Sequence, residues 1–202
     1  MTIYKIGLCT SAPVATTTNA ISYSNCSVVY DYPAGATVSI AKGGISNLPG
    51  AFTRPANGTY ASAFIEMSPS STVKGANTFS YNMVGALSSS GPYCWSNGGT
   101  VYSYQNTPTN SVTCGQTPGT AASTTTILNG FGGSATFVYS NVVNGTSVSA
   151  YLVNDAYKLP TSGLPNVGNG VYRMIGVANT TTTVTSNTSS LDVAFDISNG
   201  TN

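Results

Sequence analysis

The sequence contains no histidine and very little charge of either sign. Its 202 residues include six Lys or Arg and five Asp or Glu, so charged residues make up 5% of the chain and the net charge is +1. Between Gly75 and Asn154 there is no Asp, Glu, Lys, Arg or His at all. General acid–base catalysis, metal ligation and phosphate binding draw mainly on these side chains. We therefore expect a structural or adhesive protein rather than an enzyme, with no cofactor and no metal site.

The few acidic residues give no sign of a catalytic pair. A glycosidase places two carboxylates about 5 to 9.5 Å apart around one bond. Asp192 and Asp196 would share one face of a strand at a separation of about 13 Å, because a strand rises about 3.3 Å per residue. Serine is abundant, but without histidine a Ser–Lys pair is the remaining nucleophilic arrangement, and no pattern marks a lysine as buried.

A net charge of +1 also lacks the basic surface that nucleic acids and anionic membranes attract. No uninterrupted apolar run reaches the length of a membrane-spanning helix, so we expect no membrane insertion. The segment from Met1 to Lys5 has no pattern of a secretory signal. We therefore expect either a mature product or a chain that begins at a true start and leaves the cell by another route.

Low net charge favours self-association, because copies of such a protein do not repel one another. We expect the main partner to be a second copy of the chain. Glycosylation is a compatible way of keeping this surface soluble, and glycans are a further candidate partner. The possible glycosylation sites, recognised as Asn-x-Ser/Thr sequences, are Asn25, Asn57, Asn144, Asn179, Asn187 and Asn199.

The four cysteines form two pairs that are close in sequence, Cys9 with Cys26 and Cys94 with Cys114. The lack of histidine and of a Cys-x-x-Cys spacing argues against a zinc site. Four cysteines allow three pairings. We expect these two, since each closes a short loop and would stabilise the fold by about 3 kcal/mol. Disulfides predict an extracellular or cell-surface protein, whereas four free thiols would fit a cytosolic or virion protein.

Apolar and polar residues alternate with a period of two in many segments, which are separated by Gly, Pro and Asn. The segments 61–67, 135–139 and 148–152 show this pattern clearly. Arg173 interrupts the apolar side of another predicted strand, at 171–177. The pattern predicts an all-β fold with about 10 to 13 strands and little or no helix, as in a single antiparallel β-sandwich or jelly roll over residues 1–202.

Either terminal segment is a candidate for exchange between subunits, residues 1–8 or residues 191–198. A sandwich that lacks one strand exposes an apolar groove, which a strand from a neighbour can fill. At the N-terminus, Tyr4, Ile6 and Leu8 are predicted to share one face of the strand. We favour this segment, because donor strands are commonly the extension before the first disulfide. The residues that alternate at the C-terminus are Leu191, Val193, Phe195 and Ile197.

Four aromatic residues form a possible contact patch. Tyr93 and Trp95 are predicted to lie on one face of a strand, and Tyr102 and Tyr104 on one face of the next. A hairpin turn at Gly98-Gly99 would place Trp95 opposite Tyr102, whereas a turn one residue earlier would place Tyr93 there. A buried ladder of this kind would be core. An exposed ladder would be a contact between copies or a surface on which sugars stack.

The segment from Tyr4 to Thr10, Tyr-Lys-Ile-Gly-Leu-Cys-Thr, is followed by Asn25-Cys26 and later by Gly58-Thr59-Tyr60. In these short motifs about the first 115 residues of the chain resemble uncharacterised secreted β-rich proteins of marine bacteria. The whole chain more loosely resembles donor-strand subunits of extracellular filaments, such as pilins and biofilm-matrix fibres. This resemblance implies a structural subunit of a filament or surface layer that assembles by terminal-strand exchange. A virion structural protein (tail, fibre or capsid decoration) and a carbohydrate-binding adhesin domain are the alternatives.

Overall fold

The computed structural model describes residues 1–39, 46–104, 111–132, 134–160 and 170–193. Fourteen strands and one turn of 3-10 helix, η1 (Ala86–Ser88), form the regular structure of these residues, which confirms the all-β prediction. The strands are β1 Thr2–Cys9, β2 Cys26–Thr37, β3 Gly58–Tyr60, β4 Ser62–Met67, β5 Ser70–Val73, β6 Ala76–Val84, β7 Ser90–Ser96, β8 Thr100–Tyr102, β9 Val112–Gly115, β10 Thr124–Ile127, β11 Val138–Val143, β12 Thr146–Val153, β13 Arg173–Asn179 and β14 Thr182–Val184.

Six strands form one antiparallel sheet in the order β11-β12-β13-β4-β1-β2. We call the described parts of residues 1–67 and 138–193, which build and cover this sheet, the body. β11 and β12 are joined by Asn144-Gly145, whose φ angles are 49° and 80°. Two-residue hairpins favour these positive φ angles because the resulting turn matches the twist of the strands, and Asn-Gly adopts them most readily.

Side chains from both faces of the sheet are buried, as in a β-sandwich-like fold. On one face, Phe64, Ile175 and Val177 pack with Ala15 and Ile21 from the connection between β1 and β2. The opposite face carries two further clusters. Their buried members are Ile3, Ile6, Tyr30, Ala36 and Val38 in the first, and Leu8, Val29, Tyr60 and Val184 in the second. The second cluster joins β1 and β2 to the small β3–β14 sheet.

The prediction that Tyr4, Ile6 and Leu8 share one face is wrong for Tyr4. The pairing of β1 with both of its neighbours shifts between Ile3 and Lys5, which makes Tyr4 the extra residue of a β-bulge. The bulge changes the phase of the alternation, so Ile3 and Ile6 belong to the same core cluster although they are three residues apart. Tyr4 instead contacts Arg173 on the other side of the sheet.

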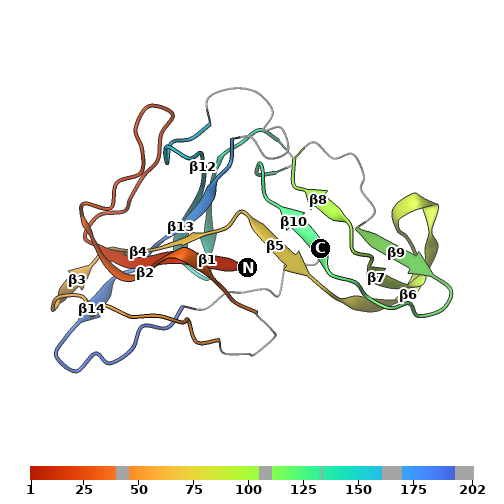
Figure 1. The fold of residues 1–202 in the computed structure, drawn as a ribbon, viewed down its shortest axis with the longest axis horizontal. Coiled ribbons are helices and arrows are strands. Elements are labelled where there is room, and N and C mark those ends of the chain that lie inside the picture. Colours follow the sequence, from red (N-terminus) through yellow and green to blue (C-terminus); the bar gives the residue numbers. More distant parts are fainter. Residues whose placement is uncertain (40–45, 105–110, 133, 161–169, 194–202) are drawn as a thin grey trace.

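The described parts of residues 68–137 leave the sheet between β4 and β11 and form an elongated second part, which we call the arm (Figure 1). The arm contains two three-stranded sheets, β5-β10-β8 and β6-β7-β9. β8 and β10 pair in parallel, whereas the other pairs in the arm are antiparallel. The molecule is therefore one six-stranded body with a long β-rich insertion.

The arm is held together mainly by polar contacts and a disulfide. Among its described residues the buried hydrophobic ones are Cys94 and Cys114, which are bonded to each other. Asn129, 5% exposed, accepts a hydrogen bond from the Tyr104 backbone N–H at 2.9 Å and donates one to the Tyr104 carbonyl at 3.2 Å. The Ser96 hydroxyl donates to the Ala122 carbonyl at 2.6 Å. None of the three hydrophobic clusters in the described residues includes a residue of the arm.

The C-terminal alternation does not give a strand where the structure describes it. Leu191 and Val193 lie outside any strand and are 40% and 44% exposed. Phe195, Asp196 and Ile197 lie outside the described residues. A regular apolar pattern needs a partner strand before it forms a ladder, and residues 191–193 make none.

Candidate functional site

The most concentrated chemistry in the body surrounds Glu66 on β4, a carboxylate that is only 2% exposed. The Tyr157 hydroxyl donates a 2.8 Å hydrogen bond to Glu66 Oε1, and the Tyr23 hydroxyl donates a 3.2 Å bond to Oε2. Arg173 Nε lies 3.3 Å from Oε1, an ion-pair contact without hydrogen-bond geometry. We call these four residues the Glu66 cluster. A buried charge that is both paired and hydrogen-bonded avoids most of the cost of losing water.

Arg173 is fixed by two aromatic rings as well as by Glu66. Its guanidinium carbon lies 3.7 Å from the centre of the Tyr4 ring and 3.8 Å from the centre of the Tyr172 ring. One guanidinium nitrogen also donates a 3.0 Å hydrogen bond to the Tyr172 hydroxyl. A guanidinium over an aromatic face is stabilised by the ring quadrupole, more strongly when water is excluded. The bulge in β1 is therefore the feature that places Tyr4 over this cation.

A second ion pair extends the cluster towards solvent. Lys5 on β1 lies between Asp31 on β2 and Glu66 on β4 in the strand register. Its Nζ is 3.4 Å from Asp31 Oδ2 and 5.4 Å from the centre of the Tyr23 ring. Because the Asp31 side chain is 51% exposed, this pair contributes only about 0 to 1 kcal/mol.

Burial is the largest cause of the altered acidity in the cluster. It raises the pKa of Tyr157 to about 12, and the hydrogen bond to Glu66 and the negative charge of that carboxylate add to the effect. Burial, the charge of Glu66 and its hydrogen bond also raise the pKa of Tyr23. Both tyrosines are therefore neutral donors at neutral pH, and both carboxylate oxygens are occupied. The cluster fastens the two tyrosine-bearing loops to the sheet and presents no free base to a substrate.

Local sequence patterns indicated this cluster only in part. Arg173 stood out because it interrupts an apolar face, and Glu66 belongs to the alternating segment 61–67. Tyr23 and Tyr157 were not predicted to belong to a site. They lie 43 and 91 residues from Glu66 in the chain, and no local pattern links loop tyrosines to a strand carboxylate at such separations.

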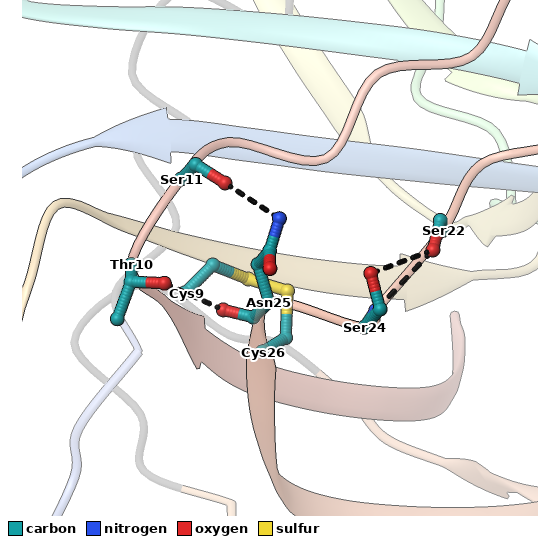
Figure 2. The surroundings of a disulfide bond; sticks show 7 residues. All are labelled: Cys9, Thr10, Ser11, Ser22, Ser24, Asn25 and Cys26. Carbon is teal, nitrogen blue, oxygen red and sulfur yellow. Dashed lines mark hydrogen bonds between the residues drawn. A yellow bond between two sulfur atoms is a disulfide. The ribbon is translucent and has the colours of Figure 1, made fainter.

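Both predicted disulfides are present, Cys9–Cys26 and Cys94–Cys114. The first closes the end of the β1–β2 pair, where Cys9 and Cys26 are direct cross-strand partners. Figure 2 shows that the residues next to it add hydrogen bonds. The Thr10 hydroxyl donates to the Asn25 carbonyl at 3.2 Å, and the Asn25 amide donates to the Ser11 hydroxyl at 3.0 Å. Two disulfides indicate folding in an oxidising environment.

The predicted hairpin between the two aromatic strands is wrong. β7, which carries Tyr93 and Trp95, pairs with β6 and β9, whereas β8, which carries Tyr102, pairs with β10 in another sheet. Gly98, at a φ of 90°, turns the chain into a crossing between sheets instead of a hairpin. Tyr104 follows β8 and takes part in the Asn129 network. Tyr93 and Trp95 therefore remain together, separate from the other two rings.

The predicted glycosylation sites lie at the surface wherever the structure describes them. These exposed asparagines are Asn25, Asn57, Asn144, Asn179 and Asn187; Asn199 lies outside the described residues. Asn57 accepts a 2.8 Å hydrogen bond from Arg54, and Asn144 occupies the turn between β11 and β12. Exposure makes these side chains accessible for modification.

The predicted exchange strand, β1, is an inner strand of the sheet in a single chain. It pairs with β2 along one edge and with β4 along the other. Its last residue is Cys9, which is bonded to Cys26 on β2. Any exchange of residues 1–8 between copies therefore begins directly at a covalent anchor, with no linker residues between the strand and the disulfide.

Neither family models, curated proteins nor solved structures match this chain. The described residues contain no helix that is long and apolar enough to cross a membrane.

Proposed function

We propose that the protein is a structural subunit of an extracellular filament or surface layer, in which copies of the chain associate through the arm. The observation that carries this proposal is the arm's lack of a hydrophobic core within its described residues. Small β-rich units usually need extra stabilisation from disulfides, metals or association. The arm has one disulfide, and packing against another copy supplies the apolar burial that it lacks.

Apolar side chains on the arm surface support this interpretation. Val84 is 76% exposed, and Leu87 is 87% exposed. Val84 is the last residue of β6 and Leu87 lies in η1, which contacts β9, the strand of Val112. Leu87 has a φ of 55°, a left-handed conformation that an ordinary side chain adopts only at a cost. The exposed large apolar residues of the arm are Val73, Tyr81, Val84, Leu87 and Val112.

The charge distribution allows these surfaces to meet. The segment from Gly75 to Asn154, which covers most of the arm and the edge strand β11, carries no Asp, Glu, Lys, Arg or His. Two copies brought together there bury no unpaired charge and experience no like-charge repulsion. Among the described residues β11 is also an edge strand of the six-stranded sheet, with exposed Tyr139, Val142 and Val143, and such edges pair readily with other strands.

The extracellular location is supported by the two disulfides and by the exposed acceptor asparagines described above. Assembly by exchange of β1 belongs to the same proposal, because an identical strand from a neighbour would fill the slot between β2 and β4. The Cys9–Cys26 disulfide makes this route more demanding than contact through the arm. A β1 strand from a neighbour remains bonded to its own chain at Cys9, so the neighbour's disulfide must lie close to the end of the sheet that the strand enters.

Electron microscopy and sedimentation of the purified protein test the proposal. We expect filaments, sheets or large oligomers from the natural sequence, and dissociation when Leu87→Glu and Val84→Lys place charges on the arm. The control is Val14→Lys, because Val14 is 53% exposed but lies in the body; this variant should assemble normally. A natural protein that stays monomeric at high concentration would refute the proposal, and arm variants that assemble as well as Val14→Lys would refute association through the arm.

A second experiment separates the two routes. A chain that lacks residues 1–8 has an open slot in its sheet, and a synthetic peptide with the sequence of residues 1–8 should bind it and restore the fold. If arm variants dissociate and the peptide does not bind, association uses the arm and β1 stays in its own chain. If only the peptide experiment succeeds, strand exchange is the route.

A further inference from the structure

The arm contains a shallow pocket of about 130 Å³ over β6 and β7. Trp95 and Tyr93 are two residues apart on β7 and therefore project from the same face. Their cross-strand partners on β6 are Ala76 and Thr78. The lining residues are Ala76, Asn77, Thr78, Tyr93, Cys94, Trp95, Pro118 and Gly119. The sequence predicted an aromatic patch here, and the structure adds the polar and backbone groups around it.

We propose that this pocket binds one neutral sugar unit, stacked on the rings of Trp95 and Tyr93. One face of a pyranose ring consists largely of C–H groups, which pack on an aromatic ring, while its hydroxyls need polar partners at the edge. Thr78 supplies a hydroxyl on the same face as the two rings, because it lies directly opposite Tyr93 in the register. Asn77 also lines the pocket.

The indole of Trp95 is held in place before any ligand arrives. Gly119 packs so closely on the ring that a Cβ atom at this position would overlap it, and a Cβ at Gly115 would lie 3.1 Å from the edge of the indole. Cys94, between Tyr93 and Trp95, is bonded to Cys114 on β9. A platform that is already rigid loses less entropy when it binds.

The lining identifies the ligand as neutral. None of the lining residues carries a charge, and the sequence has no Asp, Glu, Lys, Arg or His between Gly75 and Asn154. A carboxylate or phosphate on the ligand would lose water without gaining a partner of opposite charge, which is unfavourable. The Thr78 side chain is exposed and makes no hydrogen bond within the described residues, so its hydroxyl is available to a sugar, whereas Asn77 lies opposite Cys94 and its side chain projects from the other face of the strand.

The size of the pocket limits the ligand to one ring. Sites for drug-sized molecules are about 300 to 1,000 Å³, whereas this pocket measures about 130 Å³. A single shallow site binds weakly, but repeated copies on an assembly would raise the avidity for a glycan-coated surface. The pocket is formed by one chain, so we expect sugar binding by a monomer as well as by an assembly.

Trp95 is the one tryptophan of the chain, so intrinsic fluorescence reports directly on this pocket. The probes are the methyl glycosides of glucose, galactose, mannose and N-acetylglucosamine, with glucuronate as the charged comparison. We expect a saturable change in tryptophan emission with at least one neutral glycoside and none with glucuronate. The absence of a saturable change with all four neutral glycosides, or an equal response to glucuronate, would overturn the proposal.

Variants measured by calorimetry or NMR complete the test with the glycoside that responds. Tyr93→Ala removes one ring, and Gly119→Ala displaces the indole without removing it; each should weaken binding by about tenfold or more. The matched control is Tyr81→Ala, because Tyr81 is a 64% exposed aromatic residue of β6 that does not line the pocket. Thermal unfolding of each variant shows whether it is folded. Folded Tyr93→Ala protein that binds as well as the control would contradict the proposal.

Discussion

The Tyr157 hydroxyl donates a 2.8 Å hydrogen bond to Glu66, a residue that precedes it by 91 positions. This contact fastens the connection after β12 to the centre of the sheet, where Glu66 is also paired with Arg173. A protein with five acidic residues buries one of them among partners from three separate segments. The arrangement favours one defined packing of loops on the sheet, because a shifted loop would leave a buried charge unsatisfied.

Glu66→Gln should destabilise the body strongly. The substitution keeps the shape of the side chain but leaves the Arg173 guanidinium without its counter-charge, and breaking a buried pair in this way costs about 3 to 5 kcal/mol. Urea unfolding measures the effect. The control is Asp31→Asn, which removes a half-exposed ion pair with Lys5 and should cost about 0 to 1 kcal/mol. Equal losses for the two variants would show that the Glu66 cluster is not a special source of stability.

Alkaline pH should weaken the same cluster. The pKa of Tyr157 is raised to about 12 in the folded protein, against about 10 in an unfolded chain. A raised pKa means that the neutral hydroxyl contributes stability that is complete below pH about 10 and is lost as the pH rises towards about 12. The measurement is the free energy of unfolding as a function of pH. Tyr157→Phe should be less stable at neutral pH and should lose less stability over that alkaline range; an unchanged slope would exclude this role.

Gly7→Ala should destabilise the centre of the sheet. A Cβ atom at Gly7 would overlap the Phe64 ring and would lie 2.8 Å from the Ser27 carbonyl oxygen. Overpacking of this kind typically costs about 1 to 3 kcal/mol. The matched control is Gly58→Ala, since a Cβ atom at Gly58 would have no neighbour within 4 Å. Gly7→Ala should lower the thermal midpoint more than Gly58→Ala does. Similar midpoints for the two variants would contradict the close approach of the Phe64 ring to the backbone at Gly7.

Loss of the arm disulfide should affect the arm more than the body. Cys94 and Cys114 are the buried hydrophobic residues among those described in the arm, and a bond across a loop of this size contributes about 3 kcal/mol. We expect the Cys94→Ser and Cys114→Ser double variant to be cut by proteases within residues 68–137 while the body stays resistant. The corresponding Cys9→Ser and Cys26→Ser variant serves as the comparison. If proteases first cut the Cys94→Ser and Cys114→Ser variant within the body, this expectation would be wrong.

Local patterns predicted the fold class and both disulfides, because strand alternation and short cysteine separations are properties of neighbouring residues. The same patterns gave wrong predictions where a single extra residue shifts the alternation of a strand, or where a strand pairs with a distant segment instead of its neighbour in sequence. A bulge places Tyr4 on the opposite face from the predicted one, and residue preferences for strands do not indicate where a bulge occurs. β7 and β8 were separated into different sheets although a glycine pair lies between them, because strand pairing is decided by competing long-range partners.

The sequence by itself determined that this chain forms strands, carries almost no charge and has no histidine to perform acid–base or metal chemistry. The tertiary structure decided how Glu66, Arg173, Tyr23 and Tyr157 meet, since contacts between distant segments depend on the packing of the whole sheet. It also decided that the body holds the core and that the arm has none in its described residues. Which part of a chain buries its apolar side chains depends on how the strands are connected and packed, and this cannot be read from the pattern of neighbouring residues.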